Sequence, residues 1–376
     1  MNKYLILLVF LAACDDGGDA EGAVDAGRAD GSSVDVGLVD AAVDAAVDLG
    51  PADALPDAGP APTNVPGRFD RTVPVGEEVR EFIVYVPEAA AGSTPVPVVF
   101  MFHGTSGDGE RFYNNSGWKE KADVEGFIAV FPSAQLHCFY EDENRDGDFE
   151  DEGEIKVTTK WDGGRLGDEW PLCGPEVIAQ LPPARRAEAD HPVADDLGFV
   201  DAMIDHLVAE QAVDARRIYA SGFSNGGQFT SRLALERSER FAAAACAAGS
   251  LAIDPIPGPR AVPFVFTVGE RDDRFTVPYG VEALPVDETA LDLMALLVGK
   301  YLVAFELAPD HTTATTQVGG RQIFRADYTT STVGGENVFV FAVLEGLFHQ
   351  YPNGDNYPLA LTAPLWEFFS QYSLPE

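Results

Sequence analysis

Basic residues are scarce in this chain of 376 residues, which contains 25 Lys and Arg against 61 Asp and Glu. The formal net charge is −36, and so large a negative charge repels phosphate backbones and anionic lipid headgroups. We therefore expect no nucleic acid among the partners, and no docking of the folded part on an anionic membrane surface. Solubility is the simplest explanation of the charge, and the sequence does not indicate an oligomeric state.

Long hydrophobic runs are also missing, because the apolar run after Lys3 ends at residue 11, well short of the roughly 20 residues that span a bilayer. This run leads into Leu11-Ala12-Ala13-Cys14, which fits a bacterial lipobox with small residues before the cysteine. We interpret residues 1–14 as a lipoprotein signal segment, cleaved before Cys14 and lipidated there. A plain secretory signal is the alternative. The lipoprotein interpretation predicts an exported protein, anchored to a bacterial membrane in the periplasm or at the cell surface.

Aromatic side chains are absent from residues 15–65, which consist mainly of Asp, Ala, Gly, Val and Pro. The segment holds twelve acids and one base, Arg28, so it cannot bury enough apolar area to offset the entropy of ordering. Self-repulsion favours an extended chain. We predict a disordered acidic tether, followed at residues 66–376 by one large folded domain.

Cysteine is rare, with four residues in the chain. Cys246 lies in an alanine-rich apolar run, so we expect a buried free thiol. A disulfide between Cys138 and Cys173 is then the natural arrangement in an exported protein, because it needs no cysteine from the core. The sequence alone does not prove this pairing.

Strand-like and helix-like segments alternate through the folded part. The order predicts an α/β architecture, with a mostly parallel sheet covered by helices on both faces and antiparallel strands at its start. The expected strands are residues 80–86, 96–102, 127–131, 216–221, 243–248, 262–268 and 337–343, and the expected helices are residues 116–125, 194–210, 225–236 and 357–372.

Residues 135–192 do not fit this alternation and are interpreted as an insertion. An Asp-x-Asn-x-Asp-Gly spacing within it places oxygen ligands on a tight bend, as in calcium loops, although Gly153 stands where such loops carry glutamate. Nine acids between residues 141 and 154 would repel one another without a cation. A structural calcium ion is one prediction, and a solvated acidic loop is the other. The candidate ligands are Asp142, Asn144, Asp146 and Asp148.

The strongest chemical signal is a strand that runs into Gly222-Phe223-Ser224-Asn225-Gly226 and then into a helix. A Gly-x-Ser-x-Gly turn in this context is typical of a nucleophile elbow, because the sharp turn leaves no space for a Cβ at the glycines. The helix also directs its positive end at the serine. We predict Ser224 as a nucleophile, with an ordinary strand–turn–helix junction as the alternative.

Histidine is scarce too, and of the six in the chain only His311 and His349 follow Ser224. A serine hydroxyl needs a base within reach, the base needs an orienting acid, and in this arrangement the chain order is serine, acid, histidine. His349 follows the end of a strand, where loops carry catalytic groups, so we prefer it as the base. His311 lies in a polar stretch and is expected to face solvent.

The orienting acid is expected after the strand at residues 262–268. Asp272 and Asp273 are adjacent there, so we expect only one of them to point at the imidazole. Asp272 is the preferred acid, Asp273 is the alternative, and Glu270 is a third candidate.

Acyl transfer also requires donors for the negative charge that develops on the carbonyl oxygen, each worth roughly 3–4 kcal/mol. One expected donor is the backbone N–H of Asn225. The other is the N–H of Thr105, in the loop after the strand at 96–102, where Gly104 permits close approach. His103 precedes the serine and ends a buried strand, so we expect a structural role for it. This chemistry requires no cofactor for catalysis.

Together these motifs resemble the polyhydroxybutyrate depolymerase and feruloyl/acetylxylan esterase group of α/β-hydrolases over about residues 66–374. The resemblance implies an α/β-hydrolase fold, a triad of Ser224, Asp272 and His349, and ester substrates that include polymers. Gln350-Tyr351-Pro352 and the acidic insertion depart from the pattern where substrate would bind. The motifs that carry the resemblance are Phe102-His103-Gly104-Thr105, Asp196-Leu197-Gly198-Phe199-Val200, Arg217 to Gly227, Asp272 with Val277-Pro278-Tyr279, and His349.

Trp161 and Trp170 in the insertion have two interpretations: they line a cleft for substrate, or they form the apolar centre of the insertion. The sequence thus predicts an exported serine ester hydrolase that acts on polyhydroxyalkanoate-type polyesters or related esters. A feruloyl or acetylxylan esterase is the alternative within this class. A non-catalytic surface-binding protein is the alternative outside it, and a serine peptidase on the same fold is a third possibility.

Overall fold

The structure is a computed structural model that describes residues 62–141 and 154–375, and Ala58–Glu376 form one compact unit. The strands are β1 (Gly67–Val75), β2 (Glu78–Val86), β3 (Val96–Phe102), β4 (Ile128–Pro132), β5 (Leu136–Tyr140), β6 (Ile155–Thr159), β7 (Val213–Phe223), β8 (Ala243–Ala247), β9 (Phe264–Gly269), β10 (Thr312–Val318), β11 (Arg321–Tyr328) and β12 (Phe339–Leu344). The helices are η1 (Glu88–Ala90), α1 (Gly109–Asn115), α2 (Trp118–Glu125), α3 (Pro175–Ile178), α4 (Pro183–Ala189), α5 (Asp196–Glu210), α6 (Asn225–Glu236), α7 (Asp273–Tyr279), α8 (Thr289–Leu293), α9 (Ala295–Ala304) and α10 (Thr362–Phe369).

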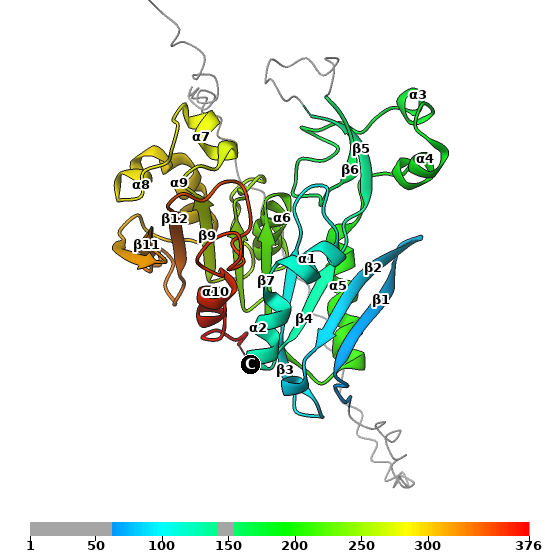
Figure 1. The fold of residues 1–376 in the computed structure, drawn as a ribbon, viewed down its shortest axis with the longest axis horizontal. Coiled ribbons are helices and arrows are strands. Elements are labelled where there is room, and N and C mark those ends of the chain that lie inside the picture. Colours follow the sequence, from blue (N-terminus) through cyan, green and yellow to red (C-terminus); the bar gives the residue numbers. More distant parts are fainter. Residues whose placement is uncertain (1–61, 142–153, 376) are drawn as a thin grey trace, which may run out of the picture. The chain divides into compact units, whose positions relative to one another are not determined.

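A ten-stranded sheet with the order β1-β2-β4-β3-β7-β8-β9-β12-β11-β10 forms the centre of the unit (Figure 1). From β4 to β12 every neighbouring pair is parallel, and antiparallel strands continue the sheet at both sides. The parallel strands are covered on both faces, which explains their nearly continuous apolar sequences. The prediction of a mostly parallel α/β-hydrolase sheet is confirmed.

Helices cover both faces of this sheet, and β3 shows how. Phe100 belongs to the core cluster that contains Phe199 of α5 and Phe229 of α6. Its neighbour Val99 belongs to the cluster on the other face, with Trp118 of α2. Because successive strand side chains alternate between faces, one apolar strand supplies both layers of the core.

The predicted ends of two central elements match those in the structure: β3 and α6 begin and end at the residues predicted from the sequence. The final helix is shorter than predicted, Thr362–Phe369 in place of residues 357–372. β1, β10 and β11 were not predicted. β10 has a Thr-rich, mostly exposed sequence without apolar alternation, so its sequence pattern did not predict a strand.

The insertion at residues 135–192 contains the separate β5–β6 hairpin together with α3 and α4. Cys138 and Cys173 form a disulfide with an S–S distance of 2.02 Å, which confirms the predicted pairing. Cys138 also packs with Ile178 in a small core of the insertion's own. Cys246 is buried and free, as expected.

The predicted signal segment, its Cys14 and most of the predicted tether lie outside the described residues, so these assignments stay predictions. Within the described ranges, no helix combines the length and apolar character needed to cross a membrane.

Candidate active site

The nucleophile elbow joins β7 to α6, and Ser224 between them adopts φ 53° and ψ −119°. This left-handed conformation is strained for a residue with a side chain, and close packing around the turn maintains it. A Cβ on Gly222 would lie 2.1 Å from the carbonyl oxygen of Gly226. A Cβ on Gly226 would lie 2.3 Å from the carbonyl oxygen of Phe102. Glycine is therefore required at both positions of the motif.

Ser224, His349 and Asp272 form a continuous chain of hydrogen bonds. His349 Nε2 lies 2.9 Å from Ser224 Oγ, and its Nδ1 lies 3.0 and 2.9 Å from the two carboxylate oxygens of Asp272. The Asp272 side chain is fully buried, whereas that of His349 is 21% exposed. A buried carboxylate that accepts from Nδ1–H leaves Nε2 as the acceptor for the serine proton. The structure thus brings together three side chains that the sequence separates by up to 125 positions.

The alternative candidates have other partners. Asp273 is 69% exposed and its nearest cation, Arg274, is 4.0 Å away. Glu270 accepts a hydrogen bond from the backbone N–H of Gly346, at 2.6 Å. His311 lies 3.6 Å from Glu288 and does not contact the elbow in any hydrogen bond of the described residues. Of these candidates, it is Asp272 and His349 that the fold places beside the serine.

The loop after β3 lies against the elbow, because a Cβ on Gly104 would come within 3.2 Å of the Ser224 Cβ. Thr105 is the next residue of this loop. Asn225 opens α6, and the first N–H groups of a helix have no acceptor within the helix. The predicted donors, the N–H groups of Thr105 and Asn225, therefore belong to two segments that meet at Ser224, and their role stays a prediction.

His103 is fully buried at the end of β3. Its Nδ1–H donates to the Gly104 carbonyl oxygen at 2.7 Å, and its Nε2 accepts from the Ala134 N–H at 2.9 Å. Burial lowers the pKa of His103 to about 4, so the ring is neutral near pH 7. These contacts fit the structural role expected from the sequence.

Trp161 is fully buried, with its indole stacked on Phe229 at a ring distance of 5.3 Å. Such a side chain cannot contact substrate, so the interpretation of Trp161 as a cleft residue is wrong, and it belongs to the apolar core. Trp170 is partly buried, and the ammonium group of Lys160 lies 3.6 Å from its ring centre. Burial lowers the pKa of Lys160 to about 8. Trp170, in contrast, packs against residues of the insertion itself.

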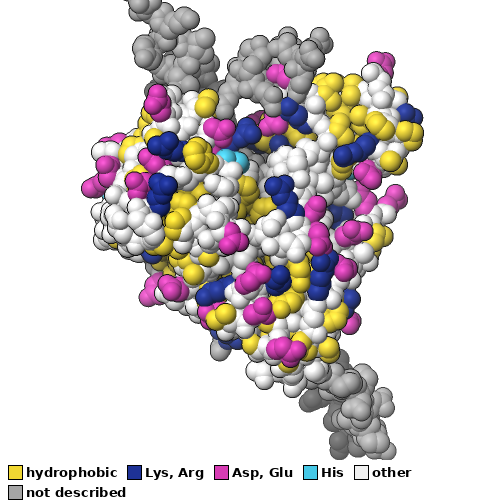
Figure 2. Space-filling model, viewed as in Figure 1, with side chains coloured by type: hydrophobic (Ala, Val, Ile, Leu, Met, Phe, Trp, Pro, Cys, Tyr) yellow, Lys and Arg dark blue, Asp and Glu magenta, His cyan; other side chains and the backbone are white. Residues whose placement is uncertain are grey.

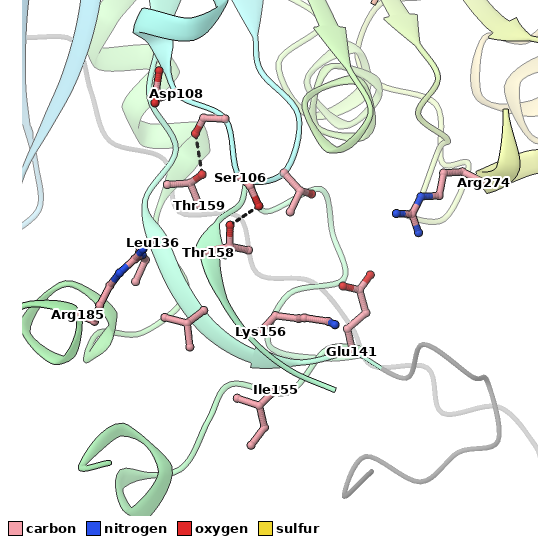
Figure 3. A pocket seen from close by; sticks show the side chains of 13 residues that line it. Ser106, Asp108, Leu136, Glu141, Ile155, Lys156, Thr158, Thr159, Arg185 and Arg274 are labelled. Carbon is pink, nitrogen blue, oxygen red and sulfur yellow. Dashed lines mark hydrogen bonds between the residues drawn. The ribbon is translucent and has the colours of Figure 1, made fainter. Parts of the chain in front are cut away.

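A polar groove of about 630 Å³ borders the predicted donor loop (Figure 3). One side is formed by the segment from Thr105 to Asp108, and the adjoining side by the β5–β6 hairpin. The two sides are in contact, since Ser106 Oγ of the loop lies 2.6 Å from Thr158 Oγ1 of β6. Arg185 and Arg274 lie at its margins. Figure 2 shows this face of the molecule, where a histidine side chain is visible with Lys and Arg side chains nearby. The sequence carried no signal for this groove, because its walls come from distant segments.

The four candidate calcium ligands, Asp142, Asn144, Asp146 and Asp148, lie outside the described residues. Among the residues that are described, no group of three or more His, Cys, Asp or Glu side chains could hold a metal ion. The calcium ion therefore stays a prediction.

Comparison with known proteins finds one family model and several esterases that are similar to this chain. Residues 193–254, which hold α5, β7, the elbow, α6 and β8, match the sequence model of the prolyl oligopeptidase family. A bifunctional acetylxylan esterase/xylanase of Neocallimastix patriciarum is 25% identical over 194 residues, 52% of this chain and 22% of that protein. Feruloyl esterase B of Thermothelomyces thermophilus is 23% identical over 183 residues, 46% of this chain and 48% of that protein.

Among solved structures, an acetyl xylan esterase from Aspergillus awamori aligns with a TM-score of 0.48 at 14% identity, over 81% of this chain and 99% of that one. The chain spans less than half the length of the two curated relatives named above. Together, the parallel sheet, the elbow and the sequence similarity to esterases support an esterase-like α/β-hydrolase of the serine hydrolase type.

Proposed function

We propose that this protein hydrolyses carboxylic esters by a two-step acyl-enzyme mechanism, with Ser224 as nucleophile, His349 as general base and Asp272 as the orienting acid. The observation that carries the proposal is the chain of hydrogen bonds from Asp272 through His349 to Ser224. The strained elbow supports it, because residues with backbone strain of this kind cluster at active sites.

In the first step, His349 Nε2 takes the proton of Ser224 Oγ while that oxygen attacks the ester carbonyl carbon. The carbonyl oxygen becomes negatively charged and accepts hydrogen bonds from the N–H groups of Thr105 and Asn225. The imidazolium of His349 then donates its proton to the departing alcohol, and an acyl group remains on Ser224. In the second step, water loses a proton to His349 and attacks the acyl carbon. The bond from that carbon to Ser224 Oγ then breaks, His349 returns the proton to Ser224 Oγ, and the acid is released.

The substrate class that we favour is an ester carried by a plant polysaccharide, with an acetyl or a feruloyl acyl group. The relatives are named acetylxylan and feruloyl esterases, and the groove beside Thr105 is lined with hydroxyl and charged groups that suit a sugar chain. Phe348, which precedes His349 in the chain, is 55% exposed and is our candidate for an apolar contact with the acyl group. A polyhydroxyalkanoate-type polyester is the competing substrate.

A serine peptidase is the second candidate function, because the matched family at residues 193–254 is that of prolyl oligopeptidase. Parallel assays with acetylated xylan, methyl feruloate, a polyhydroxybutyrate film and a proline-containing peptide separate the candidates. We expect release of acetate or ferulate, and cleavage of the peptide alone would replace the esterase assignment.

The chemistry itself is tested with p-nitrophenyl acetate and a fluorophosphonate on the wild type and on Ser224→Ala. We expect the substitution to lower kcat by about 10⁴-fold or more and to abolish labelling. A wild type that neither hydrolyses the ester nor reacts with the fluorophosphonate would instead support a surface-binding protein.

We further propose that the protein is exported and lipid-anchored through Cys14. Expression in a bacterial host should place the wild type in the detergent phase and Cys14→Ala in the aqueous phase. Equal partition of both proteins would contradict the anchor.

A further inference from the structure

The segment of the insertion that follows β6 contacts both segments that carry the predicted oxyanion donors, and Trp161 is at the centre of these contacts. Its Nε1–H donates to the carbonyl oxygen of His103 at 3.0 Å, two residues before Thr105. Its ring also packs edge-on against Phe102 with the centroids 5.3 Å apart, and it stacks on Phe229 of α6. One buried side chain therefore bridges the end of β3 and the first turns of α6.

The backbone of Trp161 forms a second link, to the residue after the nucleophile. Its N–H donates to Asn225 Oδ1 at 2.7 Å, and Asn225 Nδ2 donates to its carbonyl oxygen at 3.0 Å. Asn225 is 4% exposed, so water does not compete for these two bonds. The paired bonds fix the Asn225 side chain, and through it the peptide that carries the predicted donor N–H.

The donor loop itself is held by the last residues of β6. The Ser106 N–H donates to the Thr159 carbonyl oxygen at 3.0 Å. In return, Thr159 Oγ1 donates to the Gly107 carbonyl oxygen at 2.7 Å. Residues 159–161 thus contact the loop on one side and α6 on the other.

The next residue, Asp162, anchors this connection to the main body. Its N–H donates to Asp196 Oδ2 at 2.8 Å, and Asp196 pairs with Arg80 at 2.7 Å, both side chains being 1% exposed. Its own carboxylate pairs with Arg232 of α6 at 2.6 Å. Because breaking a buried ion pair leaves a charge without compensation, these contacts hold the segment after β6 in one position.

From these contacts we propose that Trp161 and the side chain of Asn225 are positioning residues, which set the separation between the two backbone donors at Thr105 and Asn225. The inference rests on the proposed function, since those donors act on the oxyanion of acyl transfer. Stabilisation of an oxyanion requires donors within about 2.7–3.1 Å of the charged oxygen, so small shifts of either segment lower the rate. The insertion is then part of the catalytic scaffold through Trp161, in the segment that follows β6.

The test compares Asn225→Ala and Trp161→Phe with Ser231→Ala. Asn225→Ala removes both bonds to Trp161 and keeps the backbone N–H, and Trp161→Phe removes the donor to His103. Ser231 is the matched control because it lies on the same helix, is buried, and bonds to the Gly227 carbonyl oxygen and the Tyr301 hydroxyl. The measurements are kcat and KM for p-nitrophenyl acetate, the Ki of a phenylboronic acid, and Tm.

We expect Asn225→Ala to lower kcat by about 10- to 100-fold and Trp161→Phe by about 3- to 10-fold, with KM nearly unchanged. The Ki of the boronic acid should rise in parallel, because its tetrahedral adduct with Ser224 uses the same donors. Ser231→Ala should lower Tm and leave kcat within about twofold of the wild type.

Two results would overturn the inference alone: an active wild type whose Asn225→Ala variant keeps kcat within twofold, or a loss of kcat without a rise in Ki. A wild type that is inactive on every ester and unreactive with a fluorophosphonate would instead overturn the proposed function, and the inference with it.

Discussion

The nucleophile elbow and the insertion at residues 135–192 meet at Asn225 and Trp161, yet they are held in different ways. At the elbow, glycines at 222 and 226 pack against backbone atoms at distances that no other residue permits. The insertion depends on contacts between distant segments, including a disulfide, the Lys160–Trp170 contact and hydrogen bonds to α6. The difference teaches that local geometry places the nucleophile, whereas long-range contacts place the groups that assist it.

The largest expected effect distinguishes Asp272, which contacts His349, from its exposed neighbour Asp273. Asp272→Asn should lower kcat by about 10⁴-fold, because a buried amide cannot hold His349 in the tautomer that accepts from Ser224. Asp273→Asn should leave kcat within about twofold, since that side chain is exposed. Steady-state kinetics with p-nitrophenyl acetate measures both. The reverse order of effects would move the acid to Asp273.

The next comparison places a methyl group on a glycine of each region. Gly226→Ala should lower the free energy of unfolding by at least about 3 kcal/mol, because its Cβ would meet backbone oxygens at 2.3 and 2.4 Å. Gly174→Ala in the insertion should cost less than about 1 kcal/mol, since the space around Gly174 is open and its φ is −70°. Urea unfolding measures both, and equal losses would contradict a tightly packed elbow.

The disulfide tests how far the insertion depends on its own crosslink. The bridge spans 35 positions, and its loss should lower the free energy of unfolding by about 3–4 kcal/mol in the chain-entropy account. Urea unfolding with and without reductant measures this for the wild type. The Cys138→Ala/Cys173→Ala double variant is the control and should not respond to reductant. A response of the double variant would assign the effect to Cys246.

A buried histidine gives a prediction of pH dependence beside the elbow. The pKa of His103 is lowered to about 4, below its ordinary value near 6.5, so the unfolded chain binds the proton first as the pH falls. Stability should therefore be complete above pH 6.5 and decrease by about 3 kcal/mol between pH 6.5 and pH 4 on account of this group. His103→Gln should show a flatter profile over that window in urea unfolding. Identical profiles would exclude the contribution of His103.

The smallest expected effect concerns the acidic segment of the insertion, whose candidate ligands include Asp146 and Asp148. If calcium binds there, chelation should lower the Tm by a few degrees through ordinary ligand linkage. An Asp146→Ala/Asp148→Ala variant should not respond to the chelator. An unchanged Tm of the wild type after thorough chelation would remove the calcium prediction.

The fold and the reacting side chains were predictable where the signal is local. A few consecutive residues are enough to recognise a continuous apolar strand such as β3, or the glycine pattern around Ser224. Trp161 shows the limit, because its burial depends on residues more than 50 positions away, such as His103 and Asn225. An aromatic residue in an insertion looks the same in sequence whether it faces substrate or fills a core.

The most direct test of the central claim is to trap the acyl-enzyme. The wild type and His349→Ala are mixed with p-nitrophenyl acetate, quenched in acid during turnover, digested and examined by peptide mass spectrometry. We predict an acetyl group on Ser224 in the wild type and little or none in His349→Ala, because that variant lacks the base 2.9 Å from the serine oxygen. Rapid turnover of the ester with acetyl on another residue, or equal acetylation in both proteins, would contradict the account.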